Sequence, residues 1–305
     1  MTPRDRDCAG KVWPVSCKTL ARFLQNVGVP ANRRVPPPVV GLDHATSTEG
    51  RAQKKAAMKL DFTDQVVIVT GAGSGIGKAA AMDFAKAGAI VVSLDVVGAK
   101  ECADEIASMG LRAEGHVMDV RNAAAWSALI GALVSAHGKV DVLVNNAGVA
   151  VPGDTAIDVS EETWDKMMNV NAKGVWLGMR AVLPGMVERR AGKICNVAST
   201  AAHIGLRDAA AYCASKGAVL ALTRQAGVQY APFNVQINSI SPGTTMTGLQ
   251  RDVTEAQRAV FKTLTPIDRF AEPEEVSKAI LFLCSHGSSF ITGSDLSVDG
   301  GMVAL

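Results

Sequence analysis

Several signatures of common protein classes are missing from this chain of 305 residues. It has no uninterrupted run of about 18 apolar residues, which argues against a transmembrane helix. Its six cysteines form no C-x-x-C pair and its five histidines lack metal-ligand spacing. We therefore expect reduced thiols, a cytoplasmic location and no metal site. No G-x-S-x-G sequence is present, which argues against a serine hydrolase. The net charge is only +2, so the composition gives no general case for binding nucleic acid or an anionic membrane.

The first 58 residues differ in composition from the rest of the chain. They hold 10 Lys/Arg and 4 Asp/Glu, a net charge of +6, and six of the twelve prolines. They lack strong hydrophobic periodicity, so little apolar surface would offset the entropy lost on ordering them. Three interpretations are open: a disordered extension, a targeting peptide, or upstream sequence joined by a start-site assignment ahead of Met58. We favour the third, and we expect residues 1–57 to be dispensable for folding and activity.

Residues 59–305 alternate between strand-like and helix-length segments. Apolar runs occur at 66–69, 89–94, 140–144, 192–197 and 235–240, and residues 78–88 read as a helix closed by a glycine. With 48% hydrophobic residues, the chain can bury a sizeable core. The alternation predicts an α/β fold of the Rossmann type. This is a single domain with a doubly wound parallel sheet and helices on both of its faces.

A glycine-rich turn follows the first predicted strand. Residues 70–77 read T-G-A-G-S-G-I-G, and the predicted helix begins directly after them. Glycines let the backbone approach a pyrophosphate closely, and the free N–H groups at a helix N-terminus favour its negative charge. The segment therefore predicts a nucleotide site.

Asp95 ends the second predicted strand, about 20 positions beyond the glycine turn. An acidic residue at this place can accept hydrogen bonds from the adenosine ribose hydroxyls. Its charge would repel the 2′-phosphate of NADP. We therefore predict that the cofactor is NAD.

Tyr212 and Lys216 lie four residues apart, and Ser199 lies thirteen residues before Tyr212. The i, i+4 spacing places the phenol and the ammonium on one face of a helix. A free tyrosine has a pKa of about 10. A nearby ammonium favours the phenolate, so we expect Lys216 to lower the pKa of Tyr212. Such a tyrosine could exchange a proton with an alcohol or a ketone near neutral pH.

In this order and spacing, the motifs resemble those of the short-chain dehydrogenase/reductase family over essentially all of residues 59–305. The matching segments are Thr70-Gly71-x-x-x-Gly75-Ile76-Gly77, Asp119-Val120, Asn145-Asn146-Ala147-Gly148, Asn171, Ser199, Tyr212-x-x-x-Lys216, and Pro242-Gly243 with Thr247. None of these segments departs from the family's pattern, and the weakest agreement is at Thr245, where the family more often carries Val or Ile.

The resemblance implies four catalytic residues. Asn171 would hold a water in a proton relay, and Ser199 would hydrogen-bond the substrate oxygen. Tyr212 would be the acid/base, and Lys216 would bind the nicotinamide ribose. The implied dinucleotide site consists of Gly71, Ser74, Gly75, Ile76, Gly77, Asp95, Asp119, Val120, Asn146, Ala147, Gly148, Tyr212, Lys216, Pro242, Gly243, Thr245 and Thr247.

The residues and the resemblance together predict an NAD(H)-dependent oxidoreductase that interconverts a secondary alcohol and a ketone. The segment 244–271 would form a lid with an apolar face, which favours a small, largely apolar substrate. One alternative is an NADPH-dependent 3-oxoacyl reductase, against which Asp95 and Ser74 argue. Another is an inactive nucleotide-binding regulator, against which the complete catalytic set argues. The resemblance also implies a homotetramer.

Overall fold

The computed structural model describes residues 60–151, 153–248 and 262–305. The expectations for residues 1–57, and for the central part of the lid at 249–261, lie outside these residues. No helix in the described part of the chain is both long and apolar enough to cross a membrane.

The described strands form one parallel sheet in the order β3-β2-β1-β4-β5-β6-β7. Their bounds are β1 Val66–Thr70, β2 Ile90–Asp95, β3 Ala113–Val117, β4 Val142–Asn145, β5 Gly192–Val197, β6 Val235–Pro242 and β7 Asp295–Val298. Five strands, β1, β2, β4, β5 and β6, were predicted from their apolar runs, whereas β3 and β7 were not. β3 lies at one edge of the sheet and is half-exposed along its length. Because it is not buried on both faces, it needs no continuous apolar run, and its sequence reads AEGHV.

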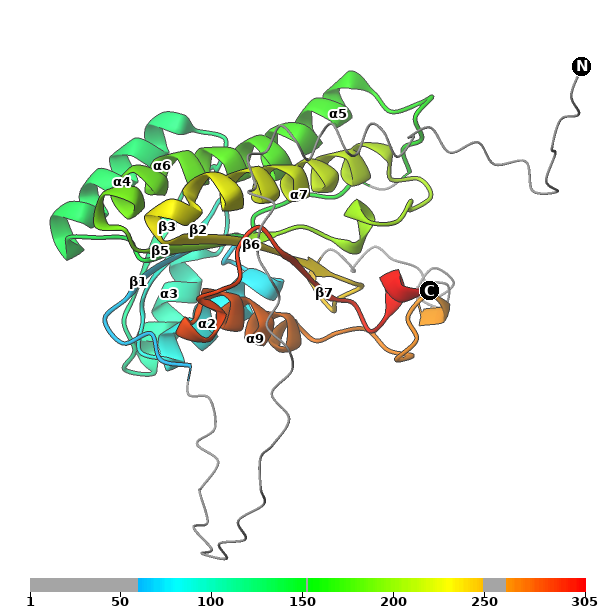
Figure 1. The fold of residues 1–305 in the computed structure, drawn as a ribbon. Helices are drawn as coiled ribbons and strands as arrows, with labels where there is room; N and C mark the ends of the chain where they lie inside the picture. Colours follow the sequence, from blue (N-terminus) through cyan, green and yellow to red (C-terminus); the bar gives the residue numbers. More distant parts are fainter. Residues whose placement is uncertain (1–59, 152, 249–261) are drawn as a thin grey trace, which may run out of the picture. The chain divides into compact units, whose positions relative to one another are not determined.

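Two layers of helices cover the sheet (Figure 1). One face carries α2 (Gly75–Lys86), α3 (Ala99–Ser108) and α9 (Pro273–Cys284). The other carries α4 (Ala123–His137), α6 (Gly174–Arg189) and α7 (Ala210–Tyr230). A shorter helix, α5 (Glu161–Met167), runs through a π-helical turn, Met168–Lys173, into α6. The predicted α/β Rossmann-type fold is confirmed.

Each face of the sheet packs into its own hydrophobic core. One cluster joins Ile68 and Leu143 to Trp126 of α4 and Met186 of α6. The other joins the alternate residues of the same strands, such as Val67 and Val144, to side chains of α2, α3 and α9. Successive side chains of a strand point to opposite faces. Central strands buried on both sides therefore read as continuous apolar runs.

Local capping residues fix where the helices begin. Asn122 accepts a hydrogen bond from the backbone of Ala125 at the start of α4, and Ser160 accepts one from Thr163 at the start of α5. At the start of α9, the side chains of Glu272 and Glu275 form a capping box. Each such cap satisfies an N–H group that has no partner inside its own helix.

Candidate active site

A cleft lies where the carboxyl ends of the strands meet. β1 lies between β2 and β4, so the connections after β1 and after β4 leave the sheet in opposite directions and open a crevice between them. The cleft has a larger lobe of about 490 Å³ and a smaller lobe of about 140 Å³. Both lobes share five lining residues, Ile76, Asn146, Gly148, Val149 and Thr247, so they adjoin.

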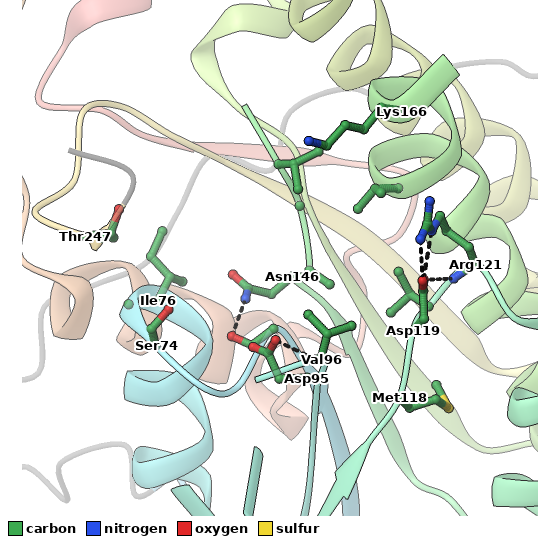
Figure 2. A pocket seen from close by; sticks show the side chains of 18 residues that line it. Ser74, Ile76, Asp95, Val96, Met118, Asp119, Arg121, Asn146, Lys166 and Thr247 are labelled. Carbon is green, nitrogen blue, oxygen red and sulfur yellow. Dashed lines mark hydrogen bonds and ion pairs between the residues drawn. The ribbon is translucent and has the colours of Figure 1, made fainter. Parts of the chain in front are cut away.

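The larger lobe collects most of the predicted dinucleotide residues (Figure 2). Those that line it are Gly71, Ser74, Gly75, Ile76, Asp95, Asp119, Val120, Asn146, Ala147, Gly148 and Thr247. The sequence did not single out Val96, Met118, Arg121, Val149, Lys166, Val170 and Gly248, which line it as well. These residues belong to no recognisable motif, because a residue can line a cavity wherever the fold places it there, whatever its type.

The glycine turn is packed backbone against backbone. Gly71 has a φ of +67°, and a Cβ on Gly77 would lie 2.1 Å from the carbonyl oxygen of Gly71. Asn146 donates from Nδ2 to the carbonyl oxygen of Thr70 at 3.0 Å. The Thr70 hydroxyl oxygen in turn accepts the N–H groups of Asn146 and Ala147, each at 2.9 Å. These hydrogen bonds fix the turn to the residues that follow β4. Gly77 packs against the backbone of Gly71 and does not line the lobe.

Asp95 is held in place by the protein backbone. Its Oδ2 accepts the N–H of Gly73 at 2.9 Å. Its Oδ1 accepts the N–H groups of Val96 at 2.7 Å and Val97 at 3.2 Å. A Cβ on Gly73 would lie 2.0 Å from the carbonyl oxygen of Val97, so this close approach requires glycine. The carboxylate thus borders the lobe in a fixed orientation, beside the turn that would hold a phosphate.

Asp119 has a partner that the sequence analysis did not foresee. Arg121 donates from Nε and Nη2 to the Asp119 carboxylate at 2.6–3.0 Å. These hydrogen bonds lower the pKa of Asp119 and raise the pKa of Arg121. The Arg121 side chain is 51% exposed and that of Asp119 37%, so the pair adds little stability. It does place a guanidinium plane at the wall of the larger lobe.

The smaller lobe brings together the remaining predicted residues except Gly77 and Asn171. It is lined by Ser199, Tyr212, Lys216, Pro242, Gly243, Thr245 and Thr247, with Ile76, Asn146, Gly148, Val149, Val197 and Ala198. Ser199 follows β5, Tyr212 lies in the first turn of α7, and Pro242 ends β6. Neighbouring parallel strands therefore bring residues that are far apart in the sequence to one place.

Burial raises the pKa of Tyr212, and the neighbouring Ser199 hydroxyl, which favours the phenolate, offsets only part of this increase. The expectation that Lys216 lowers this pKa is wrong for the protein alone. The Lys216 Nζ lies 5.8 Å from the centre of the tyrosine ring, and desolvation of the phenolate outweighs the available stabilisation.

Lys216 is itself almost fully buried. Its Nζ donates to the carbonyl oxygen of Val197 at 2.8 Å, and a Cβ on Gly148 would lie 3.5 Å from it. Burial lowers the pKa of Lys216 to about 8, because the ammonium has lost most of its hydration. The side chain lines the smaller lobe, next to Gly148, which lines both lobes.

Asn171 lies within the π-helical turn and lines neither lobe. Its Oδ1 accepts the N–H of Val149 at 2.8 Å, and its Nδ2 donates to the carbonyl oxygen of Val149 at 2.9 Å and to Ser215 at 3.0 Å. The amide thus ties the loop after β4 to α7, the helix that carries Tyr212 and Lys216. A role for Asn171 in holding a water stays a prediction.

The cleft fits a dinucleotide by the chemistry of its walls. One end offers the N–H groups of a glycine turn at the start of α2 and a fixed carboxylate at the end of β2. The other end offers two hydroxyls and a buried lysine. Among the described residues, no group of three or more His, Cys, Asp or Glu side chains could hold a metal ion.

Comparisons with known proteins agree with this geometry. A family model described as enoyl-(acyl carrier protein) reductase matches residues 71–303. An NAD-dependent glycerol dehydrogenase from Listeria innocua is 39% identical over 79% of this chain and 94% of its own length. A 3-oxoacyl-acyl-carrier-protein reductase from Thermotoga maritima is 36% identical over 78% of this chain and 98% of its own.

A solved structure shares the fold. It is a protein from Beutenbergia cavernae, proposed to be an NAD(P)-dependent gluconate 5-dehydrogenase and holding NADP at low occupancy. It superposes with a TM-score of 0.77 at 35% identity, covering 81% of this chain and all of that one. On these matches, and on the motifs and cleft described above, the chain belongs to the short-chain dehydrogenase/reductase family.

Proposed function

We propose that the protein is an NAD(H)-dependent oxidoreductase that interconverts a secondary alcohol and a ketone. The observation that carries this proposal is the Ser199–Tyr212 hydroxyl pair beside Lys216, in the smaller lobe of a cleft suited to a dinucleotide. An alcohol becomes a ketone by losing a proton and a hydride, so a site for this reaction needs a base and a hydride acceptor.

The residues divide these tasks between them. Tyr212 as phenolate takes the hydroxyl proton of the alcohol, and Ser199 orients the reacting oxygen by a hydrogen bond. The bound nicotinamide supplies the chemistry of hydride acceptance or donation. Lys216 would hold the nicotinamide ribose with its ammonium, and the proton taken up by Tyr212 would pass through Lys216 and a water held at Asn171 to the solvent. In the reverse direction, neutral Tyr212 donates the proton to the ketone.

Asp95 supports NAD as the cofactor. Its carboxylate already accepts three backbone N–H groups, yet carboxylate oxygens have about four lone-pair sites, so acceptor capacity remains for a ribose hydroxyl. A 2′-phosphate would meet this charge in a partly desolvated crevice, where like charges repel. The two residues that follow, Val96 and Val97, are exposed and apolar and so offer no charge to a phosphate.

The walls of the smaller lobe support a modest, largely apolar substrate. Ile76, Val149, Val197, Ala198 and Pro242 contribute apolar surface around the two hydroxyls. A 3-oxoacyl reductase is the competing function, because one relative at 36% identity carries that activity in its name. Asp95 argues against the NADPH that we expect such an enzyme to use.

A substrate screen tests the proposal directly. Cyclic and aliphatic secondary alcohols with NAD or NADP, and ketones and a 3-oxoacyl thioester with NADH or NADPH, would be followed by the absorbance of the reduced nicotinamide. We expect turnover of alcohols and ketones with NAD(H). Turnover confined to the thioester with NADPH would instead establish the competing function, and no turnover with any pair would contradict both.

The pH dependence follows from the state of Tyr212. Burial raises its pKa, so the phenolate is the minor form near neutrality and its fraction grows as the pH rises. Alcohol oxidation needs the phenolate and should accelerate between about pH 6 and pH 9, whereas ketone reduction needs the phenol and should not. Measuring kcat in both directions checks this. An oxidation rate that falls across that range would contradict the role of Tyr212 as base.

We also propose a homotetramer. Closed symmetry is the usual state of soluble oligomers, and two tryptophans, Trp164 and Trp176, are each 41% exposed on the α5 and α6 side. Large aromatic side chains are enriched at protein interfaces. Light scattering at micromolar concentration should give four times the mass of the chain, and a monomer would contradict the proposal.

A further inference from the structure

The larger lobe of the cleft contains two cationic side chains with different surroundings. Among its described lining residues these are Arg121 and Lys166. Arg121 is hydrogen-bonded to the carboxylate of Asp119, which neutralises its charge. The side chain of Lys166 forms no hydrogen bond or ion pair with any described residue. Figure 2 shows its ammonium extending from α5 into the lobe, which Asn146 also lines. One positive charge therefore faces the lobe without a partner in the described chain.

The opposite wall provides hydrogen-bond donors without a cation. The glycine turn lines the lobe with Gly71, Ser74, Gly75 and Ile76, whose contribution to an anion is backbone N–H groups and the dipole of α2. The nearest lysine in the sequence, Lys78, is ion-paired with Glu105 at 2.6 Å and does not line the lobe. A diphosphate carries about two negative charges, so the turn alone leaves it without a full counter-charge.

We propose that Lys166 binds the diphosphate of the dinucleotide from the side opposite the glycine turn. This inference rests on the proposed function, because it assumes that the lobe holds a nicotinamide dinucleotide. Lys166 would then contribute to cofactor affinity without touching the reacting atoms, since Tyr212 and Ser199 line the other lobe. It carries no motif, because a flexible lysine can reach a phosphate from many backbone positions.

The test is the dissociation constant of NADH, measured by fluorescence titration at low and at high salt. Lys166→Gln should weaken binding roughly three- to fivefold at low salt, the upper part of the range for an exposed charge pair. The difference should shrink at high salt, because screening weakens exposed charge pairs. Lys166→Arg keeps the charge and should bind within about twofold of the parent protein.

Two controls separate the proposed contact from other effects. Lys173→Gln removes the same charge from an exposed position in the same helical run, outside both lobes, and should leave the dissociation constant unchanged. ADP-ribose, which has the diphosphate, should compete with NADH less well in Lys166→Gln, whereas adenosine should compete equally in both proteins. Glutamine suits a helix almost as well as lysine does, so the melting temperature should be retained.

The outcomes test the role of Lys166 separately from the proposed binding of a nicotinamide dinucleotide. Failure of the parent protein to bind NADH or ADP-ribose would overturn the proposed cofactor and the role of Lys166 together. Normal NADH binding by Lys166→Gln, or an equal loss in Lys173→Gln, would overturn the role of Lys166 alone. An equal loss for adenosine would show that Lys166 contacts the adenosine part and not the diphosphate, and would likewise overturn it.

Discussion

Replacing Tyr212 with phenylalanine should lower kcat by about 10²- to 10⁴-fold and leave NADH binding nearly unchanged. The range is that of general acid–base catalysis by a positioned side chain. The substitution removes one oxygen, which shares the smaller lobe with the Ser199 hydroxyl. The ring, its place in the first turn of α7 and the neighbouring Lys216 remain. Steady-state rates in both directions, together with a fluorescence titration of NADH, measure the two effects separately.

The chain provides a matched control for this experiment. It has only two tyrosines, and the second, Tyr230, ends α7 and packs against the core away from the cleft. Tyr230→Phe should keep the parental kcat. If Tyr212→Phe retains more than about a third of the parental kcat, general acid–base catalysis must be assigned to another group.

Replacing Asp95 with asparagine should raise the NADP:NAD ratio of kcat/KM roughly tenfold, the size of a change of about 1.4 kcal/mol. The charge that opposes the 2′-phosphate is lost, while one side-chain oxygen remains to accept the N–H groups of Val96 and Val97. The new amide would face the N–H of Gly73, which now donates to Oδ2. Two donors would then oppose each other, so affinity for NAD should fall as well.

Asp104→Asn is the control for net charge. Asp104 lies exposed on α3, the helix that follows the same loop, and does not line the cleft. It should leave the cofactor ratio unchanged. Equal kcat/KM for NAD and NADP in the parent protein would show that Asp95 does not select the cofactor, whatever its variants do.

Much of the site could be predicted because its chemistry depends on spacing. The glycine turn and Asp95 each come at the end of a predicted strand. Tyr212 and Lys216 are separated by one helical turn. Both kinds of spacing can be read directly from the sequence. The central strands were predictable for a related reason. β1 and β4 are buried on both faces, and only a continuous apolar run suits that environment.

The features that were missed depend on three-dimensional proximity. β3 and β7 are largely half-exposed, so their side chains need not be apolar. Three features depend on side-chain directions that no sequence periodicity encodes. They are the Arg121–Asp119 ion pair, the hydrogen bonds between Asn171 and Val149, and the position of Lys166 in the wall of the larger lobe. The pKa of Tyr212 was mispredicted in direction because a sequence shows the nearby ammonium but not the depth of burial, which has the larger effect.

The hydrogen bonds around Asp95 and Thr70 have a consequence for the kinetics of cofactor capture. The groups that would meet the adenosine ribose and the turn that would meet the phosphates are oriented by the protein's own backbone. Their rotational freedom is therefore lost when the chain folds and not when a ligand arrives. Mutations that remove these hydrogen bonds, such as Thr70→Ala, should lower the association rate constant of NADH as well as raise its dissociation rate constant. A disordered turn must adopt the binding conformation before NADH can bind.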